Sequence, residues 1–334
     1  MKISITDDQL HALIPHVIAT VEGEPTLVEK HASFLEEAEE WASQNFVSSE
    51  VLDSIAQAPA SPEAAALQKV VAYHAFLTAI PSLDLVLMPT GFGIVNTTTI
   101  VPASKERIER LQLSIESLRD SAIEQLLHRL ASNPAWQRSV PGHYFASTLF
   151  PTFHLCRSLN INVHLWQNYQ TLHARLIKIE SVLAETYFSH EQMQSFRASA
   201  LAQMRSTSPL EEQVIRTLQS YEIQLLTDIQ VHPQCYYDLV TIIRTHPDEF
   251  PAWHTSPVAQ LYTPKIFQNK KIPPLIGYKR IFLYLCSRNL KHNDMIDFLD
   301  FLAMEAIEDA HEEHEREERH ENGEYDDDDN EDDE

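Results

Sequence analysis

Residues 104–130 read SKERIERLQLSIESLRDSAIEQLLHRL. Apolar side chains recur in this stretch every three or four residues, which is the period of a helix with one buried face. Ser104 occupies an N-cap position, and Asn133-Pro134 ends the pattern. The stretch therefore predicts one long amphipathic helix. Its apolar positions are Ile108, Leu111, Ile115, Leu118, Ile123, Leu126, Leu127 and Leu130.

Helix-start signals on both sides of this stretch predict further helices. The signals are Thr6-Asp7-Asp8-Gln9, Thr26-Leu27-Val28-Glu29, Ser61-Pro62-Glu63, Ser189-His190-Glu191-Gln192 and Ser208-Pro209-Leu210-Glu211. In the helix after Thr26, the acids Glu36, Glu37, Glu39 and Glu40 are predicted to face water. Two runs are rich in β-branched and aromatic residues, so short strands are an alternative interpretation of them: Tyr236–Thr245 and Ile281–Asn289.

Six glycines in 334 residues are few for an all-β or a doubly wound architecture. The predicted fold class is mostly α, with two helical-bundle domains, an apolar loop or hairpin insertion at residues 81–102, and a disordered acidic C-terminal tail. The predicted division is 1–140, 141–304 and 305–334. We find no internal repeat of fixed period.

The formal net charge of −24 is concentrated at one end, because residues 305–334 hold 18 acidic and 2 basic side chains. Self-repulsion should keep this tail disordered. The mildly acidic remainder offers no surface that follows a phosphate backbone, so no sequence-specific nucleic-acid binding is expected. No apolar run reaches the roughly 20 residues of a membrane span. Three widely spaced cysteines favour a reducing, intracellular setting: Cys156, Cys235 and Cys286.

The segment between Pro81 and Pro102 is the least generic part of the chain, because it is long, apolar and contains glycines. Such a segment must be buried, either under its own domain or against another subunit. Its apolar residues are therefore our candidate interface residues: Leu83, Leu85, Leu87, Phe92, Ile94, Val95 and Ile100.

No motif predicts catalytic, cofactor-binding or metal-binding residues. Thr90-Gly91-Phe92-Gly93 has neither dinucleotide-binding nor phosphate-loop spacing and is interpreted as a turn. His311, His314 and His320 are interpreted as part of a solvated acidic face, because the spacing of zinc proteases is missing. The pairs His154–Cys156 and His232–Cys235 are interpreted as packing residues. The sequence therefore predicts a protein that is not an enzyme.

Two resemblances add to this interpretation. The order of elements in residues 1–131 resembles that of the helical head–tail adaptor proteins of tailed bacteriophages, with matching pieces at Thr6–Ile18, Thr26–Asn45 and Pro62–Ile80 and an apolar excursion at 81–102. More specifically, Ala79–Val86, Pro89–Val95 and Pro102–Arg107 resemble uncharacterised proteins of phages and prophages of gut bacteria, a similarity that extends weakly into Tyr144–Ala202. The chain is about three times as long as an adaptor and carries the acidic tail, which adaptors lack.

The resemblance implies a structural virion protein that forms a homo-oligomeric ring, binds portal and tail proteins, and passes through the host cytoplasm during assembly. It implies a connector or adaptor subunit with no cofactor and no membrane contact. An alternative is a soluble phage assembly chaperone whose acidic tail shields its partner. A metal-dependent hydrolase built on the histidines of the C-terminal half is a third hypothesis.

Overall fold

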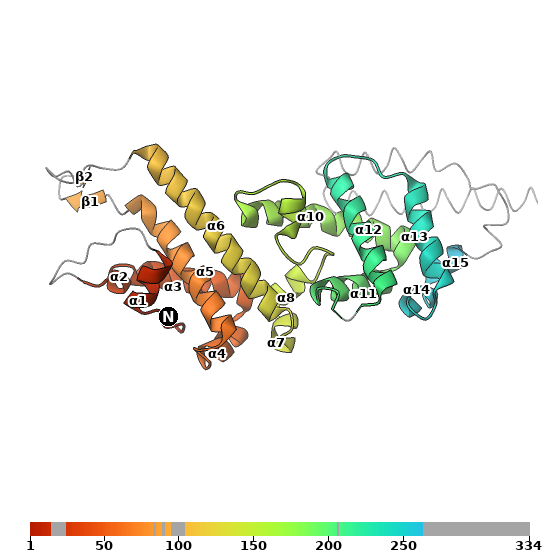
Figure 1. Cartoon of the computed structure of the whole chain (residues 1–334), viewed down its shortest axis with the longest axis horizontal. Helices are drawn as coiled ribbons and strands as arrows, with labels where there is room; N and C mark the ends of the chain where they lie inside the picture. The colour runs from red at the N-terminus through yellow and green to blue at the C-terminus, as the bar shows by residue number, and fades with distance from the viewer. Residues whose placement is uncertain (15–24, 83–84, 89–90, 95–103, 206, 263–334) are drawn as a thin grey trace, which may run out of the picture. The chain divides into compact units, whose positions relative to one another are not determined.

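The computed structural model describes residues 1–14, 25–82, 85–88, 91–94, 104–205 and 207–262; of residues 85–88 and 91–94 it describes the backbone. The described chain is mainly helical, which confirms the predicted fold class (Figure 1). The predicted acidic tail, residues 305–334, and the alternative strand Ile281–Asn289 lie outside the described residues. None of the described helices is long and apolar enough to cross a membrane.

The elements of the first half are helices and one two-stranded hairpin. They are α1 (Asp7–Leu13), α2 (Leu27–Lys30), α3 (Ala32–Ala42), the π-helical turn η1 (Ser43–Val47), α4 (Ser49–Ala56), α5 (Pro62–Ala79), the 3-10 turn η2 (Ile80–Ser82), β1 (Leu85–Met88), β2 (Gly91–Ile94), α6 (Lys105–Leu130), α7 (Pro134–Gln137) and α8 (Val140–Phe145).

All regular elements in the described part of the second half are helices or helical turns. Its elements are α9 (His154–Ser158), α10 (Leu165–Leu183), the π-helical turn η3 (Ala184–Phe188), α11 (His190–Leu201), α12 (Pro209–Leu226), α13 (Pro233–Thr245), α14 (Pro251–His254) and α15 (Pro257–Leu261). The strand alternative for Tyr236–Thr245 is wrong, because these residues belong to α13. Tyr236, Leu239, Val240 and Ile243 share one buried helix face, and this burial outweighs their β propensity.

Helix α6 is the long helix that residues 104–130 predict, and it packs along α5 (Figure 1). Ser104 occupies the N-cap position, although its side chain makes no capping hydrogen bond. Helix α5 packs against α3 on another side, so α5 is buried over most of its length. The helix-start signals at Thr6, Thr26, Ser61 and Ser208 are confirmed, because each side chain accepts a hydrogen bond from the third residue of its helix.

Glu39 corrects the prediction that the whole acidic run of α3 faces water. Its side chain is 7% exposed. Its carboxylate accepts hydrogen bonds from the backbone N–H groups of Lys2 and Ile3, at 2.7 Å and 2.6 Å for the shortest contact of each. The N-terminal segment thus crosses this part of α3 and is fixed there by a buried carboxylate, while Glu36, Glu37 and Glu40 are exposed as predicted.

The core continues through residue 140, where the sequence predicts a domain boundary. Trp136 is fully buried and donates from Nε1 to the carbonyl oxygen of Phe46 at 2.6 Å. The ring of Phe46 lies 4.8 Å from that of Trp166 in α10, measured between centroids. Residues 1–263 form one compact unit, so the predicted boundary falls inside a single packed body.

Two similar turns end α3 and α10. Each helix passes into a π-helical turn, η1 or η3, and each turn is followed by a serine with positive φ: Ser48 at φ 82°, ψ 155° and Ser189 at φ 65°, ψ 156°. Both serines then cap the next helix, because their side-chain oxygens accept from the backbone N–H of Val51 and of Gln192, respectively. Each junction therefore turns the chain sharply without leaving the new helix uncapped.

We expect Ser48→Gly and Ser189→Gly each to raise the free energy of unfolding by about 0.5–1 kcal/mol. Positive φ with ψ near 155° is a region that almost only glycine occupies without strain. Glycine replaces a serine cap at a cost of only a few tenths of a kcal/mol, so relief of strain should dominate. Urea denaturation of each variant measures the change, and Ser61→Gly, whose site has ordinary β-region backbone, is the control that should lose stability slightly. A loss at Ser48 and Ser189 equal to that control would contradict the prediction.

Candidate functional site

The hairpin β1–β2 brings four of the candidate interface residues onto one face. Its strands are antiparallel, and the register pairs Leu85 with Ile94 and Leu87 with Phe92. Residues that are paired across two strands share a face, and neighbours along a strand alternate between faces. The backbone therefore assigns these four apolar residues to one face. The other candidates, Leu83, Val95 and Ile100, lie outside the described residues.

The helix that follows the hairpin meets the core only partly in its first turns, where Leu111 is half-buried and packs against the core. Among residues 104–114, which form the cap and first turns of α6, no side chain is buried, and Leu113 is 44% exposed. Burial along α6 starts at Ile115, which is fully buried. We call the hairpin β1–β2 the arm. Its root, the helical stretch from Lys105 to Leu113, lies on the surface.

Two arginines on the root have no counter-charge among the described residues. Arg107 and Arg110 are exposed, are three apart on one helix face, and form no ion pair with any residue that the structure describes. Lys105, in contrast, pairs with Glu109, with Nζ and Oε1 3.6 Å apart. The root therefore presents two exposed guanidinium groups that no described carboxylate pairs with, on the surface of an acidic protein.

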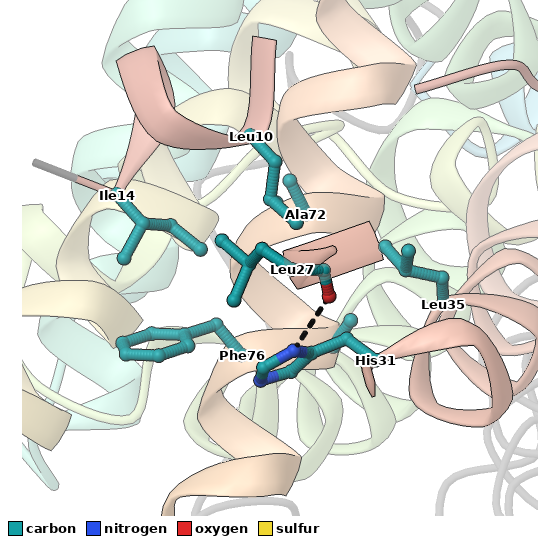
Figure 2. A pocket seen from close by; sticks show the side chains of 8 residues that line it. Leu10, Ile14, Leu27, His31, Leu35, Ala72 and Phe76 are labelled. Carbon is teal, nitrogen blue, oxygen red and sulfur yellow. Dashed lines mark hydrogen bonds between the residues drawn. The ribbon is translucent and has the colours of Figure 1, made fainter. Parts of the chain in front are cut away.

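A small cavity lies between α1, α3 and α5 and is mainly apolar (Figure 2). It measures about 10 Å³, room for at most one water molecule. His31, 6% exposed, is its polar residue: Nδ1 lies 3.0 Å from the carbonyl oxygen of Leu27, while Nε2 has no partner among the described residues. This is core packing and not a ligand site. The other lining residues are Leu10, Ile14, Leu27, Leu35, Ala72, Ala75 and Phe76.

A buried ion group joins the middle of α6 to the start of α10. Arg119 is 3% exposed and donates from Nε and a terminal nitrogen to Oδ1 of Asp120, at 2.9 Å and 2.7 Å. The other carboxylate oxygen of Asp120 accepts from the backbone N–H of Leu165, the first residue of α10, at 3.2 Å. Glu116 accepts from Arg119 at 3.2 Å and lies 2.8 Å from Nδ1 of His164. These charges satisfy one another and hold the N-terminus of α10 in place.

The same arginine lies over an aromatic pair. The rings of Trp41 and His74 stack at 3.7 Å between centroids with an interplanar angle of 5°, and the guanidinium carbon of Arg119 is 5.7 Å from the Trp41 centroid. Burial, reinforced by the charge of Arg119, lowers the pKa of His74 to about 4. His74 is therefore neutral at pH 7 and acts as a packing residue beside a cation–π contact.

A second buried cluster lies in the second half and contains more carboxylate than counter-charge. Glu180 is fully buried; it accepts from the backbone N–H of Leu149 at 2.7 Å and from Nε of Arg197 at 2.6 Å. Glu222 is also fully buried, and neither of its carboxylate oxygens has a partner among the described residues. Burial raises the pKa of Glu180 to about 7. Burial, together with the nearby charge of Glu180, raises the pKa of Glu222 well above its ordinary value.

We expect Glu222→Gln to stabilise the protein at pH 8 by about 1 kcal/mol or more and to have less effect at pH 5. Because the folded-state pKa is raised, the stability tied to the protonated carboxyl is fully present below the unfolded pKa and is lost as pH rises through the folded value. A glutamine never ionises, so it avoids that loss. Urea denaturation of both proteins between pH 5 and pH 8 measures the difference. A gap that does not widen with pH would contradict the raised pKa.

Of the two His–Cys pairs, only Cys156 agrees with the packing interpretation, because His154 and His232 are exposed and Cys235 is half-buried. Cys156 is buried, its Sγ donates to the carbonyl oxygen of Leu165 at 3.6 Å, and burial raises its pKa to about 11. His232 caps α13, with Nδ1 accepting from the backbone N–H of Gln234 at 3.2 Å. Across the described ranges, no three side chains of His, Cys, Asp or Glu are grouped to hold a metal ion. His311, His314, His320 and Cys286 lie outside those ranges.

Gly91, Phe92 and Gly93 of the predicted turn form part of β2, while Thr90 lies outside the described residues. The interpretation of this motif as a turn is therefore wrong for its last three residues, which pair with β1. The sequence signal for a strand was weak, because two of the four residues of β2 are glycines.

One comparison with known proteins gives a match. The family described as "Family of unknown function (DUF6712)" matches residues 18–146. The similarity covers less than half of the chain, includes the arm, and ends one residue after α8. Neither the curated proteins nor the solved structures contain a match to this chain.

Proposed function

We propose that this protein is a non-enzymatic structural subunit that assembles into a ring with copies of itself, as a head–tail connector or adaptor on the portal vertex of a tailed bacteriophage. The observation that carries the proposal is the arm. A hairpin with four apolar residues on one face lies in the chain between α5 and α6, and the first turns of α6, which follow it, contain no buried side chain. A contact between two different surfaces of identical subunits closes into a ring when the rotation permits.

The helical body supports this role. Its core runs without interruption from α1 to α15, and buried ion groups fix the junction between its halves. A subunit that transmits force or seals a channel needs such a rigid body. The phage setting, with portal and tail proteins as partners, rests on the family resemblance of residues 79–107 and of the order of elements in residues 1–131. It implies a location in the virion, after assembly in the host cytoplasm.

Quantitative mass spectrometry of gradient-purified particles tests this function. The particles come from a phage or induced prophage that carries the gene, and host cytosolic proteins in the same fractions serve as the contamination control. We expect the protein in particles at a copy number similar to that of the portal protein. If it is abundant in the lysate and missing from particles, the connector function is wrong and the assembly chaperone takes its place.

A further inference from the structure

The two halves of the described chain repeat the same structural details. Residues 46–55 read FVSSEVLDSI and residues 187–196 read YFSHEQMQSF, and both stretches contain the end of a π-helical turn, a serine with positive φ and the start of a helix. The glutamate seven residues before each of these stretches, Glu39 or Glu180, is buried and accepts backbone N–H donors from an earlier segment.

In each half, a tryptophan side chain donates a hydrogen bond to the π-helical turn of that half. Residues 134–139 read PAWQRS and residues 251–256 read PAWHTS. Trp136 donates from Nε1 to the carbonyl oxygen of Phe46 at 2.6 Å, and Trp253 does the same to Tyr187 at 2.9 Å. Phe46 and Tyr187 are equivalent, since each directly precedes the last residue of its π-helical turn.

The serines after the two tryptophans also correspond. The hydroxyl of Ser139 donates to the carbonyl oxygen of Trp136 at 2.7 Å, and that of Ser256 to Trp253 at 2.6 Å. Both serines then cap a short helix, α8 or α15. Unrelated helical segments would not share a rare backbone turn, an indole hydrogen bond to the same position of that turn, and a serine cap three residues later.

We infer that residues 25–262 contain a tandem duplication of one helical unit, and that the arm is an insertion into the first unit that docks onto a second copy of this chain. The correspondence sets α3–η1–α4–α5–α6–α7–α8 against α10–η3–α11–α12–α13–α14–α15. In the second unit only six residues, Thr227–His232, join α12 to α13. In the first unit the chain between α5 and α6 contains η2 and the hairpin, and α6 is 26 residues long against 13 for α13.

This comparison separates the arm from the fold. In the second unit, the tryptophan makes the same hydrogen bond to the π-helical turn, although this unit has no hairpin and no counterpart of the first turns of α6. These parts are therefore not needed to fold the unit. The family match covers residues 18–146, which is the first unit with its arm and not the second. A segment added to a unit that folds without it is expected to serve an interaction.

Charge indicates a second copy as the partner. Arg107 and Arg110 of the root form no ion pair with any described residue. The outer side of α3 presents Glu36, Glu37 and Glu40, of which Glu36 lies 3.9 Å from the N-terminal ammonium group. The chain thus carries two different surfaces of opposite charge, which is the arrangement of a heterologous contact between identical subunits. The identity of the arm's partner rests on the proposed ring, whereas the inference of a duplication does not depend on that ring.

The experiment compares the full chain with a variant in which a flexible Gly/Ser linker of about eight residues joins Ser82 to Ser104. Circular dichroism and thermal denaturation report folding, and sedimentation velocity reports assembly. We expect the variant to fold with a melting temperature within a few degrees of wild type and to sediment as a monomer where wild type assembles. A variant that fails to fold overturns the insertion, and a variant that assembles like wild type overturns the role of the arm.

Charge exchange identifies the partner. Arg107→Glu with Arg110→Glu, and separately Glu36→Lys with Glu37→Lys, should each reduce assembly at least tenfold at low salt, and the combination of all four should restore it. Lys178→Glu, on an exposed residue of α10 outside both surfaces, is the matched control. Failure of the combination to restore assembly overturns the second copy as the partner. A wild-type chain that never assembles contradicts the proposed ring and that partner, but leaves the folding of the linker variant as the test of the duplication.

Discussion

Trp136→Ala is expected to lower the free energy of unfolding by about 3–5 kcal/mol. The indole is fully buried, so its removal leaves a large cavity, and the carbonyl oxygen of Phe46 loses its donor. Trp253→Ala should cost a similar amount, because its indole makes the equivalent bond to Tyr187 and is 1% exposed. Urea denaturation followed by circular dichroism measures both changes.

The matched control for each tryptophan is phenylalanine. Trp136→Phe and Trp253→Phe keep most of the ring and lose the indole N–H, so each should cost less than the alanine variant. If either alanine variant loses less than about 1 kcal/mol, that tryptophan does not close its half of the core.

The second large effect is expected at Asp120. Asp120→Ala should destabilise the protein by about 3–5 kcal/mol, because it leaves the buried guanidinium of Arg119 with Glu116 alone and removes the acceptor of the Leu165 backbone N–H. The same urea denaturation measures the loss. Asp120→Asn, which keeps an acceptor oxygen, should fall between wild type and alanine.

An exposed ion pair provides the comparison. Lys2 and Asp53 are paired with their side chains 48% and 54% exposed, so Lys2→Ala should change the free energy of unfolding by about 0–1 kcal/mol. Equal losses from Asp120→Ala and Lys2→Ala would mean that the buried group does not hold α6 to α10.

The helices could be predicted from the sequence because their signals are local. The serine and threonine caps and the spacing of apolar residues along α6 are visible within a few residues. The burial of Glu39 could not be predicted from the sequence. A helical wheel gives the side of the helix on which a residue lies, but not which distant segment packs across that side. Residues of α13 have β propensity, and only the packing of their helical face decides between helix and strand.

The duplication escaped sequence analysis for a different reason. Its two copies do not repeat at a fixed period, since the arm lengthens the first unit between α5 and α6. The matching positions also differ in type, as Phe46 and Tyr187 do, and what they share is a backbone carbonyl that accepts an indole hydrogen bond. The stretches PAWQRS and PAWHTS were the signal that could have revealed it.

The candidate site was predictable in outline. The apolar segment between Pro81 and Pro102 marked the arm, but the pairing of Leu85 with Ile94 and of Leu87 with Phe92 required the register of the hairpin. The exposed root was not predicted, because Ile108, Leu111 and Leu118 fit the periodic pattern of a buried face. Ile108 and Leu111 are only half-buried, and Leu118, further along α6, is 42% exposed, so these three positions of the pattern do not enter the buried core.

Electron microscopy of the purified chain shows whether its copies form a ring. We expect end-on views of a closed ring with one rotational symmetry, formed by copies of this chain. Single 38.3 kDa particles at every concentration, or open filaments without closure, would contradict it.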